Sequence, residues 1–107
     1  MYIASDEEIQ EFADKATELL DGRVQKIILY GSYARNEHTP GSDIDLLILV
    51  DEKNGYDRER VSELAGKWFE ERNLLFSPTV LEVQDFNEKL KAGYSFHENV
   101  DDEGIEI

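Results

Sequence analysis

The chain has 107 residues, room for one domain over residues 1–107, and its 25 acidic residues outnumber its 11 basic residues to give a formal net charge of −14. Such a surface repels phosphate backbones, so we expect no direct binding of nucleic acid; a basic protein partner and a solvated surface suited to a salty cytoplasm both fit this charge. The chain has no cysteine, which excludes disulfides and thiolate metal sites. Residues 1–6 do not have the pattern of a signal peptide, and no apolar run reaches the roughly 20 residues that a membrane helix needs. We therefore expect a cytoplasmic protein without membrane association.

The first half of the chain reads as one helix followed by two buried strands. Residues 5–8 have the pattern of a capping box, and apolar residues recur at helical spacing over 9–20 until an Asp-Gly pair stops them. Residues 24–30 alternate so little with polar residues that they predict a strand in the centre of a sheet. We expect a short helix at 32–36, then a loop, and a second buried strand at 46–50.

The second half predicts a helix at 57–72, a strand at 76–83 and a short helix at 84–92, with one more helical turn at 94–100. Pro78 cannot donate a backbone hydrogen bond, so the third strand is expected at a sheet edge or broken near its start. The apolar pattern assigns five residues to the buried side of the long helix: Val61, Leu64, Ala65, Trp68 and Phe69.

Residues 101–107 are predicted to form an acidic tail that contains two apolar residues, Ile105 and Ile107. The tail is either a solvated end or a strip that docks on a partner. The connection between the first two strands is too short for an ordinary long crossover helix, which favours an antiparallel or mixed sheet. The fold class is therefore α/β (α+β), with a small mixed sheet flanked by helices.

The segment 31–45 carries the chemistry. Gly31 and Ser32 leave the first strand in a turn that lets a phosphate approach the backbone, and free N–H groups at a following helix start favour an anion. Asp43 and Asp45 open the second strand and, two residues apart, point to the same face. Two carboxylates with substrate phosphate and water suit Mg²⁺. We expect Asp43 and Asp45 to be metal ligands and catalytic residues.

Each of these residues also has a plainer interpretation. Gly31-Ser32 alone would be an ordinary tight turn, and the spacing to the two acids is what favours function. Arg35 either neutralises a triphosphate or forms a salt bridge to Glu37 or Asp43. Two like charges on one strand face repel each other unless a cation or a donor lies between them, which favours the metal site.

Other chemistry-bearing side chains favour structural roles. His38 and His97 lack metal-ligand spacing, and each is expected on the surface or in packing. Tyr33 stacks on a base or covers the loop. Trp68 follows the helical apolar pattern and is expected in the core. Glu82 is expected to face solvent rather than to act as a base.

Gly-Ser, ten residues and Asp-x-Asp together resemble the signature of the polymerase-beta-like nucleotidyltransferases, and the short chain resembles their minimal (MNT) branch, often antitoxins encoded beside a HEPN-domain toxin. The stretch 93–105 is also similar to the end of such domains. The resemblance implies Mg²⁺-dependent transfer of a nucleoside monophosphate from ATP (or another nucleoside triphosphate) to a hydroxyl, in those pairs a tyrosine of the HEPN partner. It assigns Gly31, Ser32 and Arg35 to the nucleotide.

The chain departs from that family pattern at two places. Asn36 stands where the family usually has Gly, and Asn tolerates the left-handed backbone that such a turn needs. The later strand places Ser77 where the family often has a third Asp, and Glu82 lies five residues further along. Three functions stay open: a transferase acting on a HEPN-type partner, an inactive domain that neutralises a partner by contact, and a nucleotide sensor. A second copy of the chain is left open as a partner.

Overall fold

Eight elements follow one another along residues 3–107, the part of the chain that the computed structural model describes. The start of the N-terminal segment, for which no signal peptide is expected, lies outside the described residues. The elements are α1 (Asp6–Leu19), β1 (Val24–Tyr30), β2 (Ile44–Val50), α2 (Asp57–Arg72), β3 (Phe76–Glu82), α3 (Val83–Lys91), α4 (Ser95–Glu103) and β4 (Ile105–Glu106).

The four strands form one mixed sheet in the order β3-β2-β1-β4. Strand β1 runs antiparallel to β2 and β4, whereas β2 and β3 are parallel because α2 carries the chain back between them. This confirms the predicted α/β fold with a small mixed sheet, the internal place of β1 and the edge position of β3. Pro78 lies opposite Leu46 on that edge strand, where its missing N–H costs least.

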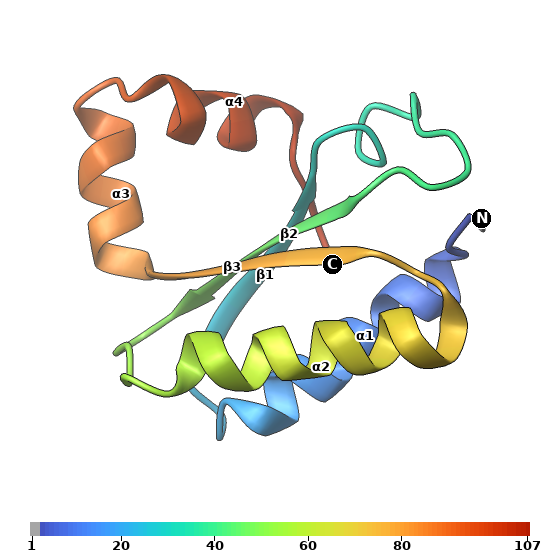
Figure 1. Cartoon of the computed structure of the whole chain (residues 1–107). Helices are drawn as coiled ribbons and strands as arrows, with labels where there is room; N and C mark the ends of the chain where they lie inside the picture. The colour runs from blue at the N-terminus through green and yellow to red at the C-terminus, as the bar shows by residue number, and fades with distance from the viewer. Residues whose placement is uncertain (1–2) are drawn as a thin grey trace.

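Helices cover both faces of the sheet, α1 and α2 on one side and α3 with α4 on the other (Figure 1). Strand β2 is buried almost throughout and serves both layers. Leu46 and Ile48 join Phe12 and Trp68 in the larger core beneath the sheet. Residues alternating with them belong to the smaller core under α3 and α4, which contains Leu47, Leu49, Phe86 and Val100.

The structure corrects three predictions about individual elements. Residues 31–36 form overlapping hydrogen-bonded turns instead of a helix at 32–36. Strand β2 begins at Ile44, two residues before the predicted start. Phe69, predicted on the buried side of α2, has 45% of its surface exposed, because the helix buries a narrower stripe than its sequence suggests.

The expected acidic tail at 101–107 is also wrong as a description of the backbone. Residues 101–103 complete α4, and the next residues form β4, which pairs Ile105 with Leu29 of β1. Ile107 packs against the larger core of its own chain, whereas 48% of Ile105 is exposed. The acidic side chains of this segment are solvent-exposed, as predicted, but the segment is part of the fold.

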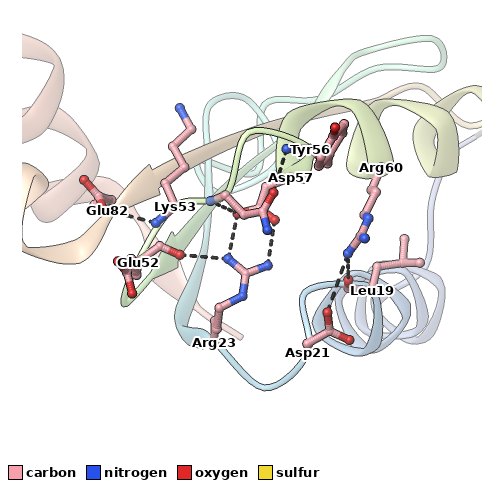
Figure 2. Close-up of polar contacts among 10 residues, drawn as sticks. Leu19, Asp21, Arg23, Glu52, Lys53, Tyr56, Asp57, Arg60 and Glu82 are labelled. Atoms are coloured by element: carbon pink, nitrogen blue, oxygen red, sulfur yellow. Dashed lines mark hydrogen bonds and ion pairs between the residues drawn. The ribbon is translucent and has the colours of Figure 1, made fainter.

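A buried ion pair joins the start of β1 to the start of α2 (Figure 2). Arg23 donates from Nη1 to Oδ2 of Asp57 at 2.8 Å and from Nη2 to Oδ1 at 2.6 Å, and Asp57 is fully buried. The N–H of Asn54 also donates to this carboxylate, at 2.8 Å. The Arg23 guanidinium holds the pKa of Asp57 below its usual value. The pair therefore fixes the loop between β2 and α2, which lies far from the 31–45 segment.

Within residues 3–107, no helix has both the length and the apolar character required to cross a membrane.

Candidate functional site

The predicted site residues gather on the sheet face that α3 and α4 cover. Tyr30 at the end of β1 lies opposite Asp45 in β2, and Asp45 lies opposite Ser77 in β3. Asp45 shares its face with Leu47, two residues on, which packs into the smaller core. The three strands therefore bring Tyr30, Asp45 and Ser77 into one row across the sheet.

Gly31 is required where it is because the Asp45 carboxylate occupies the space of a side chain. Its φ is +75°, and a Cβ on residue 31 would overlap Oδ2 of Asp45. Both the left-handed backbone and the close approach select glycine. The structure thus brings the predicted phosphate turn into direct contact with the predicted metal ligand, although the two lie 14 positions apart in the sequence.

The turn closes through irregular hydrogen bonds. The N–H of Arg35 donates to the Gly31 carbonyl at 3.2 Å and that of Glu37 donates to the Ser32 carbonyl at 2.9 Å. Asn36 has a φ of +57°, so the left-handed geometry expected from its residue type is present. Among residues 3–107, no backbone carbonyl accepts from the N–H groups of Ser32, Tyr33 or Ala34.

The two aspartates differ in their surroundings. Asp43 is exposed, whereas Asp45 is partly buried. Burial raises the pKa of Asp45, the negative charge of Asp43 raises it further, and the positive charge of Arg35 opposes both. The two carboxylates therefore form a negatively charged site of hard oxygen atoms, whose charge Arg35 only partly offsets.

Ser77 occupies the position beside this pair. Its hydroxyl donates to Oδ2 of Asp43 at 3.3 Å. Glu82 lies at the other end of β3, opposite Val50, and accepts from the N–H of Lys53 at 3.1 Å. No group of three or more His, Cys, Asp or Glu residues with the arrangement of a metal site occurs among residues 3–107. The chain therefore supplies two carboxylates, from Asp43 and Asp45, and one hydroxyl, from Ser77, at this end of the sheet.

Arg35 lies between the turn and α4. Its Nε donates to Oε1 of Glu37 at 3.1 Å, as one of the two salt-bridge alternatives expects, and its Nη1 donates to Oε2 of Glu103 at 3.4 Å. Because the Arg35 side chain is 42% exposed, both pairs can exchange for another anion. The influence of Arg35 on the Asp45 pKa shows that its charge reaches the aspartate pair.

Tyr30 is a site residue that the sequence reasoning missed. It lies opposite Asp45 and is half-buried, and burial raises its pKa while a contact with Thr79 opposes the rise. Its position directly before the Gly-Ser turn was the one signal that the sequence offered. A pocket of about 260 Å³ opens beside it, lined from β1, the turn and α4 by Tyr30, Gly31, Arg35, Phe96, Asn99, Val100 and Glu103.

The remaining candidates have packing roles. Tyr33 is buried in the larger core, and its hydroxyl accepts from the N–H of Ala4 at 3.1 Å. His38 stacks on Tyr33 with 4.0 Å between ring centroids. His97 is buried against Phe86 of α3. These contacts agree with the packing roles expected of both histidines, and they favour the loop-covering alternative for Tyr33.

Comparison with known proteins supports a single family over most of the chain. The model of the "Nucleotidyltransferase domain" family matches residues 9–104. A protein of Methanocaldococcus jannaschii named "Putative protein adenylyltransferase MJ0604" is 38% identical over 96 residues, which cover 90% of each chain. A second protein of that organism with a corresponding name is 29% identical over 100 residues, covering 92% of this chain and 94% of the relative.

Solved structures share the fold at lower sequence identity. A chain described as "Crystal structure of the toxin-antitoxin with AMP-PNP" aligns with a TM-score of 0.61 and 20% identity, covering 91% of this chain and 70% of that one. A chain of a mutant of the toxin-antitoxin MntA-HpeT aligns with a TM-score of 0.58 and 18% identity, with coverage of 91% and 70%.

Proposed function

The chain belongs to the nucleotidyltransferase domain family, and from this premise we propose that it transfers AMP from ATP to a hydroxyl group of a partner protein. One observation carries the proposal: the Gly31 turn closes directly against the Asp45 carboxylate, with Asp43 beside it. A phosphate chain held at the turn would therefore reach the two carboxylates. The names of the relatives from M. jannaschii support a protein acceptor.

The donor set fits Mg²⁺. Asp43 and Asp45 supply two carboxylates on one face. Burial raises the pKa of Asp45 most, and the negative charge of Asp43 raises it further. Mg²⁺ is typically bound by one or two protein carboxylates, with phosphate and water in the other positions. Asp43 and Asp45 would hold the ion, and Ser77 lies within reach of Asp43. A bound ion would neutralise phosphate charge as it develops on the leaving pyrophosphate.

The residues of the chain bind and orient the nucleotide. The free N–H groups that begin at Ser32 receive the β- and γ-phosphates. Arg35 exchanges its contact with Glu103 for a phosphate oxygen, which replaces a weak exposed ion pair with a charge-assisted bond. Ser77 cannot take a proton as a carboxylate would, so the base for the attacking hydroxyl is assigned to the partner.

A HEPN-type toxin is the proposed partner, in the cytoplasm. The toxin–antitoxin descriptions of chains with this fold support the pairing. The net charge of −14 supports a basic partner surface and opposes direct nucleic-acid binding. A domain of this size has little room to enclose both substrates, so we propose that a HEPN-type partner or a second copy of the chain completes the cleft.

The test is the intact mass of a co-purified HEPN-type partner after incubation with this protein, ATP and Mg²⁺. The expected result is a mass gain of one or more AMP units. The gain should be absent with the Asp43→Asn, Asp45→Asn double variant and without metal. An unchanged partner mass in a stable complex would refute transfer.

Contact neutralisation is the second candidate function, and Ser77 is the observation that favours it, because a neutral side chain lies beside the aspartate pair. The double variant separates the two models. Loss of neutralisation with binding intact supports transfer, whereas full neutralisation by the variant supports contact. A nucleotide sensor is the third candidate, supported if ATP binds but neither transfer nor a protein partner is found.

A further inference from the structure

The pocket between the turn and α4 adjoins the phosphate site but is too small for a nucleotide. Gly31 and Arg35, which belong to the turn, form one wall, and α4 forms the other. Its volume is about 260 Å³, whereas pockets that enclose a whole drug-sized ligand span about 300–1,000 Å³. A ligand held by its phosphates at the turn would therefore place only one of its parts in this pocket.

An exposed aromatic ring, that of Phe96, lines the pocket and suits it to a flat apolar group. Phe96 is 43% exposed, and it meets Tyr30 edge to face, with 5.6 Å between ring centroids. Phe96 also meets His97 edge to face, so its exposed surface is not covered by a stacked ring of either neighbour. Tyr94 is 53% exposed on the same segment but does not line the pocket. The contrast makes Phe96 the candidate and Tyr94 its natural control.

Two of the polar side chains in the lining, both from α4, bear on which flat group fits. The Asn99 amide offers a donor and an acceptor side by side, and Glu103 offers acceptors only. Adenine presents its N6 amine as a donor next to N7 as an acceptor, which an Asn amide matches with two hydrogen bonds. Guanine carries the O6 acceptor in place of that amine, which faces an acidic side chain unfavourably.

We propose that this pocket binds the adenine base of the nucleotide, with Phe96 stacking on the ring and Asn99 reading its edge. The inference rests on the proposed function, because the phosphates must lie at the turn. It assigns to α4 the selection of ATP over GTP. Glu103 holds Arg35 before the nucleotide enters and faces the base after Arg35 has turned to the phosphates.

Calorimetric titration in Mg²⁺ tests the proposal with ATP, GTP and inorganic tripolyphosphate as the three ligands. Wild-type protein should bind ATP about tenfold more tightly than tripolyphosphate. Phe96→Ala should remove that advantage and leave tripolyphosphate binding unchanged. Asn99→Leu should equalise ATP and GTP. The matched controls are Tyr94→Ala and Asn87→Leu, an exposed asparagine of α3, and both should keep the wild-type pattern with an unchanged melting temperature.

The results separate this inference from the function on which it rests. Equal binding of ATP and tripolyphosphate by the wild type would overturn the base pocket while leaving the phosphate site intact. A preference for ATP that survives in Phe96→Ala would place the base elsewhere, which also overturns the proposal. If tripolyphosphate itself fails to bind, or binds equally to the Asp43→Asn, Asp45→Asn variant, the proposed function fails and the pocket assignment fails with it.

Discussion

At the scale of single residues, the site depends on one position where backbone and carboxylate meet. Gly31 and Gly22 both have a φ of +75°, so a side chain would strain the backbone at either position. Only at Gly31 would the added Cβ overlap another group, the Asp45 carboxylate, because nothing lies within 4 Å of a Cβ at Gly22. The pair therefore separates backbone strain from the close approach that builds the site.

We predict that Gly31→Ala abolishes nucleotide binding and destabilises the protein more than Gly22→Ala does. The φ penalty alone is about 1–2 kcal/mol and applies to both variants. The overlap with Asp45 acts only at position 31. Urea unfolding and ATP titration of both variants measure the difference. Equal losses of stability, with ATP binding retained in Gly31→Ala, would show that the close contact has no functional role.

Asp45 lowers the stability of the folded protein at neutral pH. Its pKa in the folded protein is raised, by burial first and by Asp43 second, so folding favours its protonated form. That contribution to stability is present below the unfolded pKa of about 3.9 and is lost as the pH rises through the higher folded value. At pH 7 the ionised side chain therefore destabilises the protein without metal.

Asp45→Asn should accordingly raise the free energy of unfolding at pH 7 in the absence of metal. The gain should shrink as the pH falls below the raised pKa of Asp45. Chemical denaturation at several pH values, with EDTA, provides the measurement. The same variant should lose the thermal stabilisation that Mg²⁺ with ATP gives the wild type. A variant less stable than the wild type at pH 7 would contradict this view of the site.

At the scale of elements, the Arg23–Asp57 pair holds the start of β1, the loop between β2 and α2, and the start of α2 in one arrangement (Figure 2). Helix α2 has no side-chain N-cap, and Asp57 in its first turn instead ties the helix to the preceding loop by accepting from the N–H of Asn54. The α2 crossover sets the parallel pairing of β2 and β3, which places Ser77 beside Asp45. A contact at one end of the sheet thus supports the site at the other end.

Asp57→Ala should lower the free energy of unfolding by about 2 kcal/mol, the scale of hydrogen bonds to a charged group. The folded pKa of Asp57 is lowered, so its contribution is present above about pH 4 and is lost as the pH falls through that lower value. Urea melts between neutral and acid pH test both statements. The control Asp21→Asn, at the exposed pair with Arg60, should change stability by less than about 0.5 kcal/mol. Equal effects of the two substitutions would refute the role of the buried pair.

At the scale of the whole molecule, the net charge of −14 opposes its own folding. Most ion pairs among residues 3–107 have both side chains exposed, for example Lys26 with Glu106, and they offset little of this repulsion. The charge also surrounds the aspartate pair with negative potential. Cations, in solution or on a partner, should therefore stabilise the fold as a whole.

We predict that the melting temperature rises when NaCl is increased from about 0.02 M to about 0.5 M, because the screening length falls severalfold over that range. Differential scanning fluorimetry at fixed pH measures the effect. Sucrose at matched osmolality controls for nonspecific exclusion, and its effect should be smaller. A melting temperature independent of NaCl would show that the excess charge is already compensated within the fold.

Local patterns were sufficient for much of the fold. The capping box of α1, the bounds of β1 and α2, and the mixed sheet were all predicted correctly, because helix caps and hydrophobic periodicity act over a few residues. The family was recognised from residues 31–45 for the same reason. The nucleotide and metal roles of Gly31, Ser32, Arg35, Asp43 and Asp45 stay predictions.

Contacts between distant segments were decided only in the tertiary structure. A strand of two residues, β4, exists because β1 offers it a free edge, and Ile105 by itself carries no such signal. Tyr30 joins the site only through its pairing with Asp45, and the pocket exists only because α4 packs over the turn. The sequence by itself determined which residues could do chemistry and where most of the helices and strands would lie, but neither the turn at 31–36 nor strand β4. The face, the neighbours and the pKa of each group depended on burial and register, which the chain acquires only when strands far apart in the sequence come together.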